Sequence, residues 1–293
     1  MHQIHSHTSS SAAAAIALVL HLGLFHPGMA GDHGGILLAA DENQAEIPTA
    51  QIYSRNDILF CTGESMAARE NNRAASLMEA GDFSGAADVL EAALMHASLF
   101  FPYRYNLGMC RLYKSEFPSA LLHLKKALHL VPEYSRTYIQ IAYIYDRLGE
   151  VDTAIYYYRS ALRRNPKELE ALTLIGDLYF NRKQVETASQ YYSRAIEVDH
   201  RYPNGLLGMA KIHFYRGEYF KAMVQIKSID LSGDYDKALH YYYAESAYKL
   251  KDYQTAYDQY TALLRYRTDK FFLTNSLLLI QHKLDLCRRF VER

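Results

Sequence analysis

Tryptophan is absent from this chain of 293 residues, and cysteine occurs only three times, as Cys61, Cys110 and Cys287. Because three is an odd number and none of them has metal-ligand spacing, the cysteines provide neither a disulfide framework nor a zinc site. The 13 histidines add no metal site either, since His123 and His129 lie six residues apart and do not share a helix face. The sequence therefore predicts no bound metal and no cofactor.

An excess of positive charge is also missing, because 32 Lys and Arg residues balance 32 Asp and Glu residues. A nucleic-acid partner would need a basic stripe whose Lys and Arg side chains reach phosphates. The composition therefore argues against a nucleic-acid partner.

Catalytic motifs are lacking as well. The chain has no glycine-rich phosphate loop, no nucleophile elbow and no pair of helical histidines enclosing a glutamate. Asp230, Asp234 and Asp236 lack the glycine and the terminal glutamate of a calcium loop, so they are typical of a solvated turn. We expect the protein not to be an enzyme and to have no small-molecule substrate.

The N-terminal apolar segment is too short to cross a membrane. It runs for 14 residues from Ala12 to Phe25, whereas a bilayer needs about 20. Small residues follow at Gly28 and Ala30, so we expect residues 1–30 to be a signal peptide and the protein to be exported to the periplasm or cell envelope. No Lys or Arg precedes Arg55, and two alternatives stay open: a cut after residue 40, or a start codon placed too early on a cytoplasmic protein.

The next segment, residues 31–66, contains Gly34, Gly35 and Pro48 and few periodic apolar residues. This composition predicts a disordered linker.

What the chain does contain is a period of 34 residues, repeated six times from Ala67 to Lys270. Small residues mark the eighth, twentieth and twenty-seventh places of a unit, and an aromatic or aliphatic residue marks the twenty-fourth. In the third unit these residues are Ala142, Ala154, Ala161 and Tyr158. The units are residues 67–100, 101–134, 135–168, 169–202, 203–236 and 237–270.

Each unit is predicted to form two antiparallel helices. In the third unit Tyr138, Ile141 and Tyr145 recur at three- and four-residue steps, and Gly149 supplies the turn before the second helix. Two helices per unit at this spacing resemble the tetratricopeptide repeat family. The resemblance implies an all-α fold, an α-solenoid of six helix-turn-helix repeats.

Some places depart from the family's pattern. The usual tryptophan at the fourth place is absent, and Ile229 and Leu263 replace the small residue at the twenty-seventh place. We expect a weak joint with a longer turn at residues 229–234.

Residues 271–293 begin like a seventh unit but contain no second turn. We expect one long helix that caps the solenoid. Its apolar residues, among them Leu278 and Leu284, should pack on the sixth unit, whereas polar residues such as Lys283 should face water.

The resemblance also implies where a partner binds, because in this family the first helices of successive units line a concave groove. The chain contains 26 tyrosines. Carried onto this sequence, the groove-lining places hold mostly apolar and aromatic residues, together with a few charged ones. The predicted partner-binding residues are Tyr105, Met109, Tyr113, Ile139, Tyr143, Arg147, Asp177, Phe180, Lys211, Phe214, Tyr215, Tyr241, Glu245 and Tyr248. The alternative is that tyrosine is a general filler in this protein.

One subset of the family grips the C-terminal carboxylate of chaperone tails with Lys, Asn and Arg side chains. The matching places here hold Asn71, Ala75, Asn106, Arg136 and Gln140, of which only Asn106 and Arg136 fit. We therefore expect the carboxylate clamp to be absent.

The sequence thus predicts a noncatalytic scaffold that binds a peptide or protein segment in its concave groove. Six repeats behind an export signal resemble accessory proteins of outer-membrane or pilus assembly, which favours a role in the bacterial envelope. Two alternatives stay open: a structural protein that forms homo-oligomers through the groove, and a cytoplasmic adaptor.

Overall fold

The computed structural model describes residues 36–37, 51–229, 237–266 and 277–292. The chain forms two compact units, Met1–Pro166 and Lys167–Arg293. Each unit has its own apolar core, one built around residues such as Leu90 and Leu124 and the other around residues such as Ala244 and Tyr260. We call them the N-terminal unit and the C-terminal unit.

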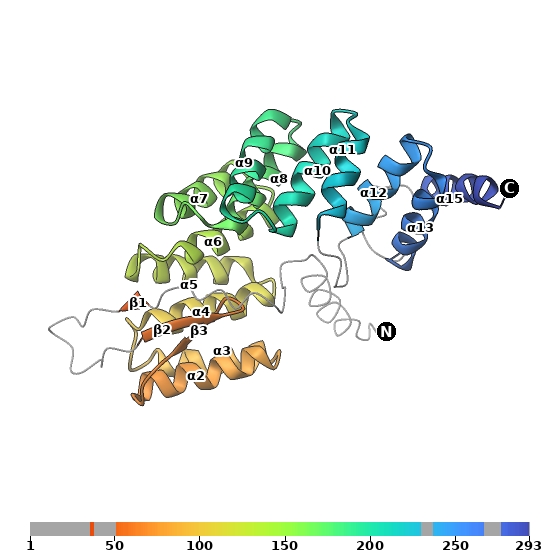
Figure 1. Cartoon of the computed structure of the whole chain (residues 1–293). Helices are drawn as coiled ribbons and strands as arrows, with labels where there is room; N and C mark the ends of the chain where they lie inside the picture. The colour runs from red at the N-terminus through yellow and green to blue at the C-terminus, as the bar shows by residue number, and fades with distance from the viewer. Residues whose placement is uncertain (1–35, 38–50, 230–236, 267–276, 293) are drawn as a thin grey trace, which may run out of the picture. The chain divides into compact units, whose positions relative to one another are not determined.

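Helices follow one another in pairs along both units (Figure 1). The first helices of the pairs are α2 (Met66–Glu79), α4 (Phe101–Tyr113), α6 (Ser135–Arg147), α8 (Leu169–Asn181), α10 (Pro203–Tyr215) and α12 (Lys237–Lys249). The second helices are α3 (Phe83–Ala93), α5 (Phe117–Leu130), α7 (Val151–Arg164), α9 (Val185–Val198), α11 (Tyr219–Lys227) and α13 (Tyr253–Leu263). All second helices begin 34 residues apart, so the predicted all-α solenoid of helix-turn-helix repeats is confirmed.

The turn inside each repeat has one conformation. Three residues join the two helices, and the middle one has a positive φ, supplied by glycine in three repeats, as at Gly149 with φ 80°. In the other three repeats the same place holds Ser115, Lys183 and Lys251, with φ of 60°, 62° and 63°. In the third repeat Gly149 N–H donates to Asp146 O and Glu150 N–H donates to Tyr145 O, both at 2.9 Å. These two bonds satisfy carbonyls at the end of the first helix, so the left-handed residue is required for the turn.

Replacing the three non-glycine residues at this place by glycine is expected to stabilise the protein. A left-handed conformation costs a residue with a Cβ roughly 1–2 kcal/mol, and the added chain entropy of glycine offsets about half of that. Ser115→Gly, Lys183→Gly and Lys251→Gly should each raise the melting temperature followed by circular dichroism. Gly149→Ala, the matched control, should lower it, and three lowered melting temperatures would contradict this account of the turn.

The small residues of the repeat let helices approach closely. The ring of Tyr192 on α9 lies between Gly176 of α8 and Gly208 of α10. A Cβ added at Gly176 would come within 2.5 Å of the Tyr192 ring, and one at Gly208 within 2.3 Å. The tyrosine therefore fixes the spacing of three helices, and only glycine fits on either side of it.

A small antiparallel sheet precedes the first repeat, and its strands contradict the prediction of a disordered linker for residues 51–61 of the segment 31–66. Its strands are β1 (Ile36–Leu37), β2 (Gln51–Arg55) and β3 (Ile58–Cys61), in the order β1-β2-β3. Two residues, Asn56 and Asp57, join β2 to β3, and both have positive φ, 49° and 60°. Two such residues form the turn that matches the twist of a β-hairpin. We call residues 51–61 the hairpin.

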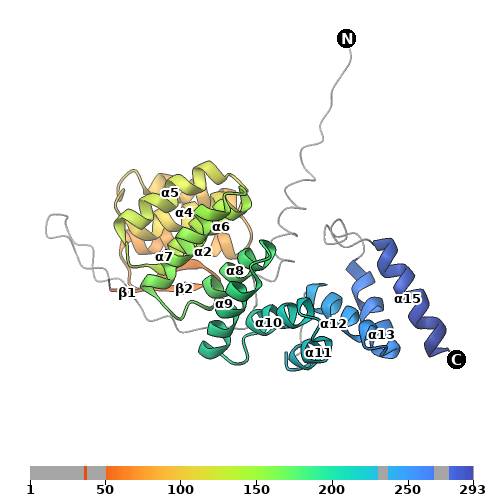
Figure 2. The same cartoon turned by 90° about the horizontal axis from the view of Figure 1, so that it is seen from above.

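The hairpin packs on the first helices of the N-terminal unit. Strand β3 contacts α2 and α4, and all four of its residues are buried. Seen from above, the strands lie on the side of α4 that faces away from α5 (Figure 2). The apolar side chains of β3 are buried by contact with α2 and α4. The composition of the segment does not show these contacts, so by itself it suggested disorder.

The C-terminal helix α15 (Leu277–Val291) packs on α13, as a capping helix should. Ile280, Leu284 and Cys287 form its buried face, whereas Leu278, expected to be packed, is exposed. The buried residues recur at steps of four and three, from Ile280 to Leu284 to Cys287, and Leu278 does not lie on this face.

Some predictions fall outside the described residues: the signal peptide at residues 1–30, most of the weak joint at residues 229–234, and the start of the capping segment at residues 271–276. Helix α11, just before that joint, has nine residues, whereas α9 has 14. Across the described parts of the chain, no helix combines the length and the apolarity needed to cross a membrane.

Candidate partner-binding surface

The structure divides the 14 predicted groove residues by exposure. Four are buried: Tyr105, Met109, Ile139 and Glu245. Eight are partly buried: Tyr113, Tyr143, Asp177, Phe180, Lys211, Phe214, Tyr241 and Tyr248. Arg147 and Tyr215 are exposed. The buried residues are corrections to the prediction, because a side chain without accessible surface cannot contact a partner.

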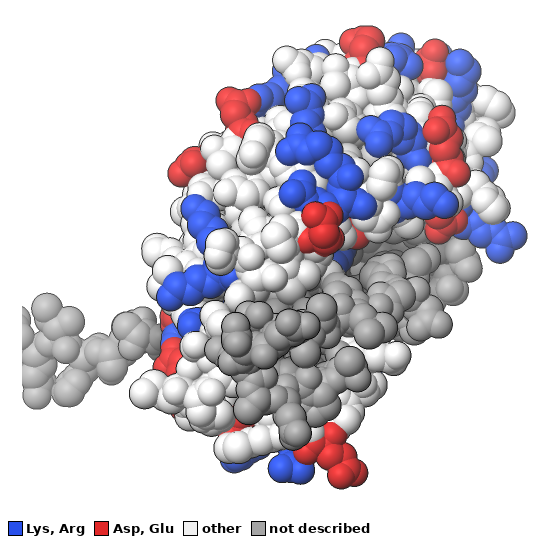
Figure 3. All heavy atoms as spheres, turned by 90° about the vertical axis from the view of Figure 1, so that its left-hand side faces the viewer, with Lys and Arg blue, Asp and Glu red and all other residues white. Residues whose placement is uncertain are grey.

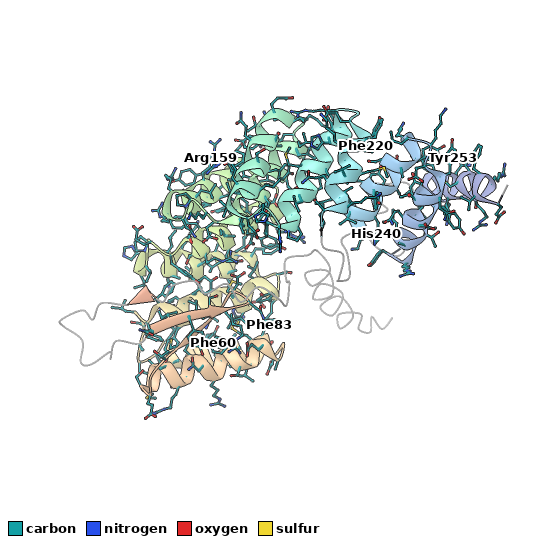
Figure 4. The ribbon with its side chains drawn as sticks, in the orientation of Figure 1. Phe60, Phe83, Arg159, Phe220, His240 and Tyr253 are labelled. Atoms are coloured by element: carbon teal, nitrogen blue, oxygen red, sulfur yellow. The ribbon has the colours of Figure 1, made fainter. Side chains whose placement is uncertain are left out.

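In the N-terminal unit the hairpin covers the first helices. Phe60 of β3 lies beside α2 (Figure 4), stacked on Tyr53 with ring centroids 5.5 Å apart. Tyr113, also predicted to line the groove, stacks instead on Phe83 of α3 at 4.4 Å. The hairpin therefore covers α2 and α4, whereas Arg147 of α6 stays exposed.

The places matched to the carboxylate clamp hold the hairpin. Asn71 and Asn106 are both buried, and the Nδ2 of each donates to Leu59 O at 2.8 Å. Arg136 Nε donates to Asp57 Oδ1 at 2.8 Å, and Gln140 Nε2 donates to Asp57 Oδ2 at 3.3 Å. A carboxylate is bound at these places after all, and it belongs to the hairpin turn. The sequence did not predict this site because residues 31–66 show too little periodicity for a strand, although Asn56 and Asp57 both tolerate the positive φ of a hairpin turn.

In the C-terminal unit the corresponding surface carries aromatic side chains. The Phe180 and Tyr215 rings, from α8 and α10, meet edge to face at 6.1 Å. Phe214 of α10 meets Tyr242 of α12 at 5.3 Å, and Tyr241 meets Tyr242 at 5.3 Å. These contacts join three successive first helices into one surface. Tyr215, with 53% of its surface exposed, is its most accessible aromatic residue among those predicted.

Charged groups on this surface form a tyrosine–carboxylate–lysine arrangement. Tyr192 Oη donates to Asp177 Oδ1 at 2.7 Å, and Lys211 Nζ donates to the same oxygen at 3.0 Å. Burial, together with the Asp177 carboxylate, raises the pKa of Tyr192. The hydroxyl therefore remains a donor at all physiological pH values, and Lys211 is held against the helix of the preceding repeat.

The same arrangement recurs two repeats later at Glu245, which is only 4% exposed. Tyr260 Oη donates to Glu245 Oε1 at 2.7 Å, and Lys283 Nζ of α15 donates to its two oxygens at 2.6 and 2.8 Å. Lys283 also lies 5.4 Å from the centre of the Tyr248 ring. The prediction that Lys283 faces water is wrong, because α15 covers the groove places of the sixth repeat and Lys283 neutralises the carboxylate there.

Removing the lysine from this buried pair is expected to destabilise the C-terminal unit. Lys283→Met would leave the Glu245 carboxylate with one donor, and breaking a buried pair in this way typically costs about 3–5 kcal/mol. Urea unfolding followed by circular dichroism should show the loss. Glu245→Gln added to Lys283→Met should restore part of it.

The control is Arg289→Met, on an exposed position of the same helix. If Lys283→Met and Arg289→Met unfold at the same urea concentration, the ion pair does not attach α15.

Tyrosines outside the groove places have other contacts. On α7, Tyr157 stacks on Tyr145 at 5.5 Å, and the Arg164 guanidinium lies 4.2 Å from the centre of the Tyr138 ring. Figure 3 shows Lys and Arg side chains gathered on one face. Arg159 of α7 is exposed (Figure 4). The interpretation of tyrosine as filler is therefore correct for these residues, which support one another and neighbouring arginines.

No metal site is evident in the described ranges, where no three His, Cys, Asp or Glu side chains are grouped closely enough to hold an ion. The described cysteines, Cys61, Cys110 and Cys287, are free and buried. Burial raises the pKa of the Cys61 thiol to about 12, which makes it a poor nucleophile.

Comparison with known proteins agrees with this architecture. The family model described as "Tetratricopeptide repeat" matches residues 71–135 and 139–205. The chain contains tetratricopeptide repeats. Proteins of this family bind other proteins, and the chain is accordingly a protein-interaction scaffold. No curated protein matches the sequence significantly.

Solved structures share the fold at low sequence identity. A tetratricopeptide repeat protein from Parabacteroides merdae is 20% identical with a TM-score of 0.55, covering 76% of this chain and 98% of its own. PilF of Pseudomonas aeruginosa is 16% identical with a TM-score of 0.63, covering 74% and 95%. PilW, described as a widely conserved type IV pilus biogenesis factor, is 17% identical with a TM-score of 0.59, covering 76% and 99%.

Proposed function

We propose that the C-terminal unit binds a segment of a partner protein on the surface formed by Phe180, Lys211, Phe214, Tyr215 and Tyr241, which we call the aromatic groove. The observation that carries the proposal is the exposure of Tyr215, at 53%, on the first-helix side of its repeat. Tyrosine anchors interfaces because its ring buries a large area with little loss of conformational entropy, and its hydroxyl adds a hydrogen bond.

The contacts of the groove suggest what it recognises. The Tyr215 ring has Phe180 at its edge and Lys183 Nζ 5.8 Å from its centre. An apolar side chain could pack on the two rings while an acidic group approaches the lysine. We infer that the bound segment carries an apolar anchor beside an acidic residue, and that the chain acts without catalysis of its own.

Truncation of Tyr215 tests the groove. Loss of an interface anchor commonly costs about 2 kcal/mol or more, which is roughly a thirtyfold loss of affinity. Tyr215→Ala should therefore release the partner that the wild-type protein captures from native extract, while the melting temperature remains near that of the wild type.

Phe220→Ala is the matched control, because Phe220 is 69% exposed on the second helix α11 of the same repeat. It should leave capture unchanged. Equal capture by Tyr215→Ala and wild type would place the partner elsewhere. If light scattering shows a dimer that only Tyr215→Ala dissociates, the groove binds a second copy of the chain.

We further propose that the scaffold works in the assembly of bacterial envelope structures. Two observations support this: the sequence pattern of residues 12–30, which is typical of an export signal, and the fold shared with PilF and the pilus biogenesis factor PilW. A cytoplasmic adaptor is the alternative, and the location of the protein decides between them.

Export predicts a processed N-terminus. Mass spectrometry of the protein from its native cells should find chains that begin near Gly31 or Asp41, because the apolar run and the small residues after it would be removed with the signal. Fractionation supplies the second measurement. An intact Met1 together with recovery from the cytoplasm would contradict export.

A further inference from the structure

The hairpin is bound along the edge of β3 by side chains of the first two repeats. Leu59 N–H donates to Asn106 Oδ1 at 2.9 Å, while Leu59 O accepts from both Asn71 and Asn106. Two residues later, Cys61 N–H donates to Asn72 Oδ1 and Cys61 O accepts from Asn72 Nδ2, each at 2.8 Å. Side-chain amides thus take the place of a neighbouring strand. They bind the backbone of Leu59 and Cys61, two residues apart on one edge of the strand, and Asn71 Nδ2 also donates to Cys61 Sγ at 3.6 Å.

A second set of contacts binds the turn of the hairpin. Asp57 forms an ion pair with Arg136 and accepts a hydrogen bond from Gln140, both on α6. The two side chains of the ion pair are only 18% and 12% exposed. Charge-assisted bonds from a planar guanidinium are strong and directional. The third repeat therefore adds selectivity for a carboxylate in the turn.

The hairpin is tethered to the repeats by a short exposed connector. Thr62, Gly63 and Glu64 are exposed, Gly63 has φ 95°, and a Cβ at Gly63 would meet no atom within 4 Å. The hairpin contacts α2 and α4 through β3, and it contacts α6 through Asp57. The connector is exposed, and its hydrogen bonds include Thr62 N–H to Gln51 O at 2.8 Å and Arg69 Nη1 to Glu64 O at 2.7 Å.

We propose that the surface of α2, α4 and α6 is a β-hairpin-binding site, and that residues 51–61 occupy it as an intramolecular ligand. The ligand class is a hairpin with a carboxylate in its two-residue turn and an apolar strand that presents its backbone edge to the three asparagines. While the hairpin is bound, this site is closed to partners. The assignment is independent of the aromatic groove, which lies on the C-terminal unit.

Cutting the connector in the folded protein tests the proposal. A protease site is inserted between Thr62 and Glu64 of the full chain, and the protein is cleaved after folding. The N-terminal fragment should remain bound during size-exclusion chromatography. A fluorescent peptide of residues 50–63, added in excess, should then exchange with it and raise the fluorescence anisotropy, whereas the uncut protein should not take up the peptide.

Two substitutions test whether the site recognises Asp57 of the exchanged peptide. A peptide with Asp57→Asn should bind at least tenfold more weakly to the cut protein. In cut Arg136→Met the difference between the two peptides should shrink to less than half its wild-type logarithm, because the ion-pair partner of the carboxylate is gone and only Gln140 remains. Arg147→Met, an exposed arginine at the end of the same helix, should behave as wild type.

Three results would overturn the proposal. Loss of the helical signal on cleavage would mean that the hairpin is an inseparable part of the core. Failure of the peptide to exchange into the cut protein would mean the same. Equal affinities of the two peptides for the wild-type site would show that Asp57 and Arg136 do not select the hairpin.

Discussion

Close approach of helices at small residues is the constraint on which the rest of this structure depends. Ala142, Ala154 and Ala161 have no exposed surface, and Gly176 and Gly208 leave room for nothing except the ring of Tyr192. Because the small places recur every 34 residues, each second helix begins in the same register as the one before it. The faces of the first helices are thereby aligned within each unit, and side chains at equivalent places become neighbours.

The same aligned face has different occupants in the two units. In the N-terminal unit it carries polar side chains, Asn71, Asn106 and Arg136, which bind a strand and a carboxylate of the chain itself. In the C-terminal unit it carries Phe180 and Tyr215, whose rings contact each other, and Phe214, whose ring contacts Tyr242; all three remain at least partly accessible. One repeat architecture thus provides a closed surface and an accessible one, and the difference is set by a few side chains at equivalent places.

A carboxylate that binds one tyrosine and one lysine joins helices in the C-terminal unit at two places. Asp177 and Glu245 each accept a hydrogen bond from the tyrosine of their own repeat and an ion pair from a lysine further along the chain. An unpaired carboxylate would be costly at Glu245, which is buried, so Lys283 and its helix are held in place. Helix α15 is attached to the sixth repeat by the same chemistry that joins Lys211 to the fourth repeat.

The sequence by itself determined the repeats. The 34-residue period predicted the helix pairs, the turn at Gly149 and the terminal helix, because helix packing requires small residues at fixed spacing and this requirement is local and periodic. The left-handed turn residues Ser115, Lys183 and Lys251 were harder to predict, since their conformation follows from the flanking helices and not from their own preference. The same register placed Phe180 and Tyr215 on the first-helix surface, where the structure has them.

Only the tertiary structure decided which of the groove places are accessible. Tyr105, Ile139 and Glu245 occupy groove places by register and are nevertheless buried, the last beneath Lys283 of α15. The strands of the hairpin gain their stability from α2 and α4, so a short segment of weak periodicity could not reveal them. Burial at such places depends on segments that lie far apart in the sequence, such as Asp57 and Arg136, 79 residues apart. A repeat register contains no information about contacts of that kind.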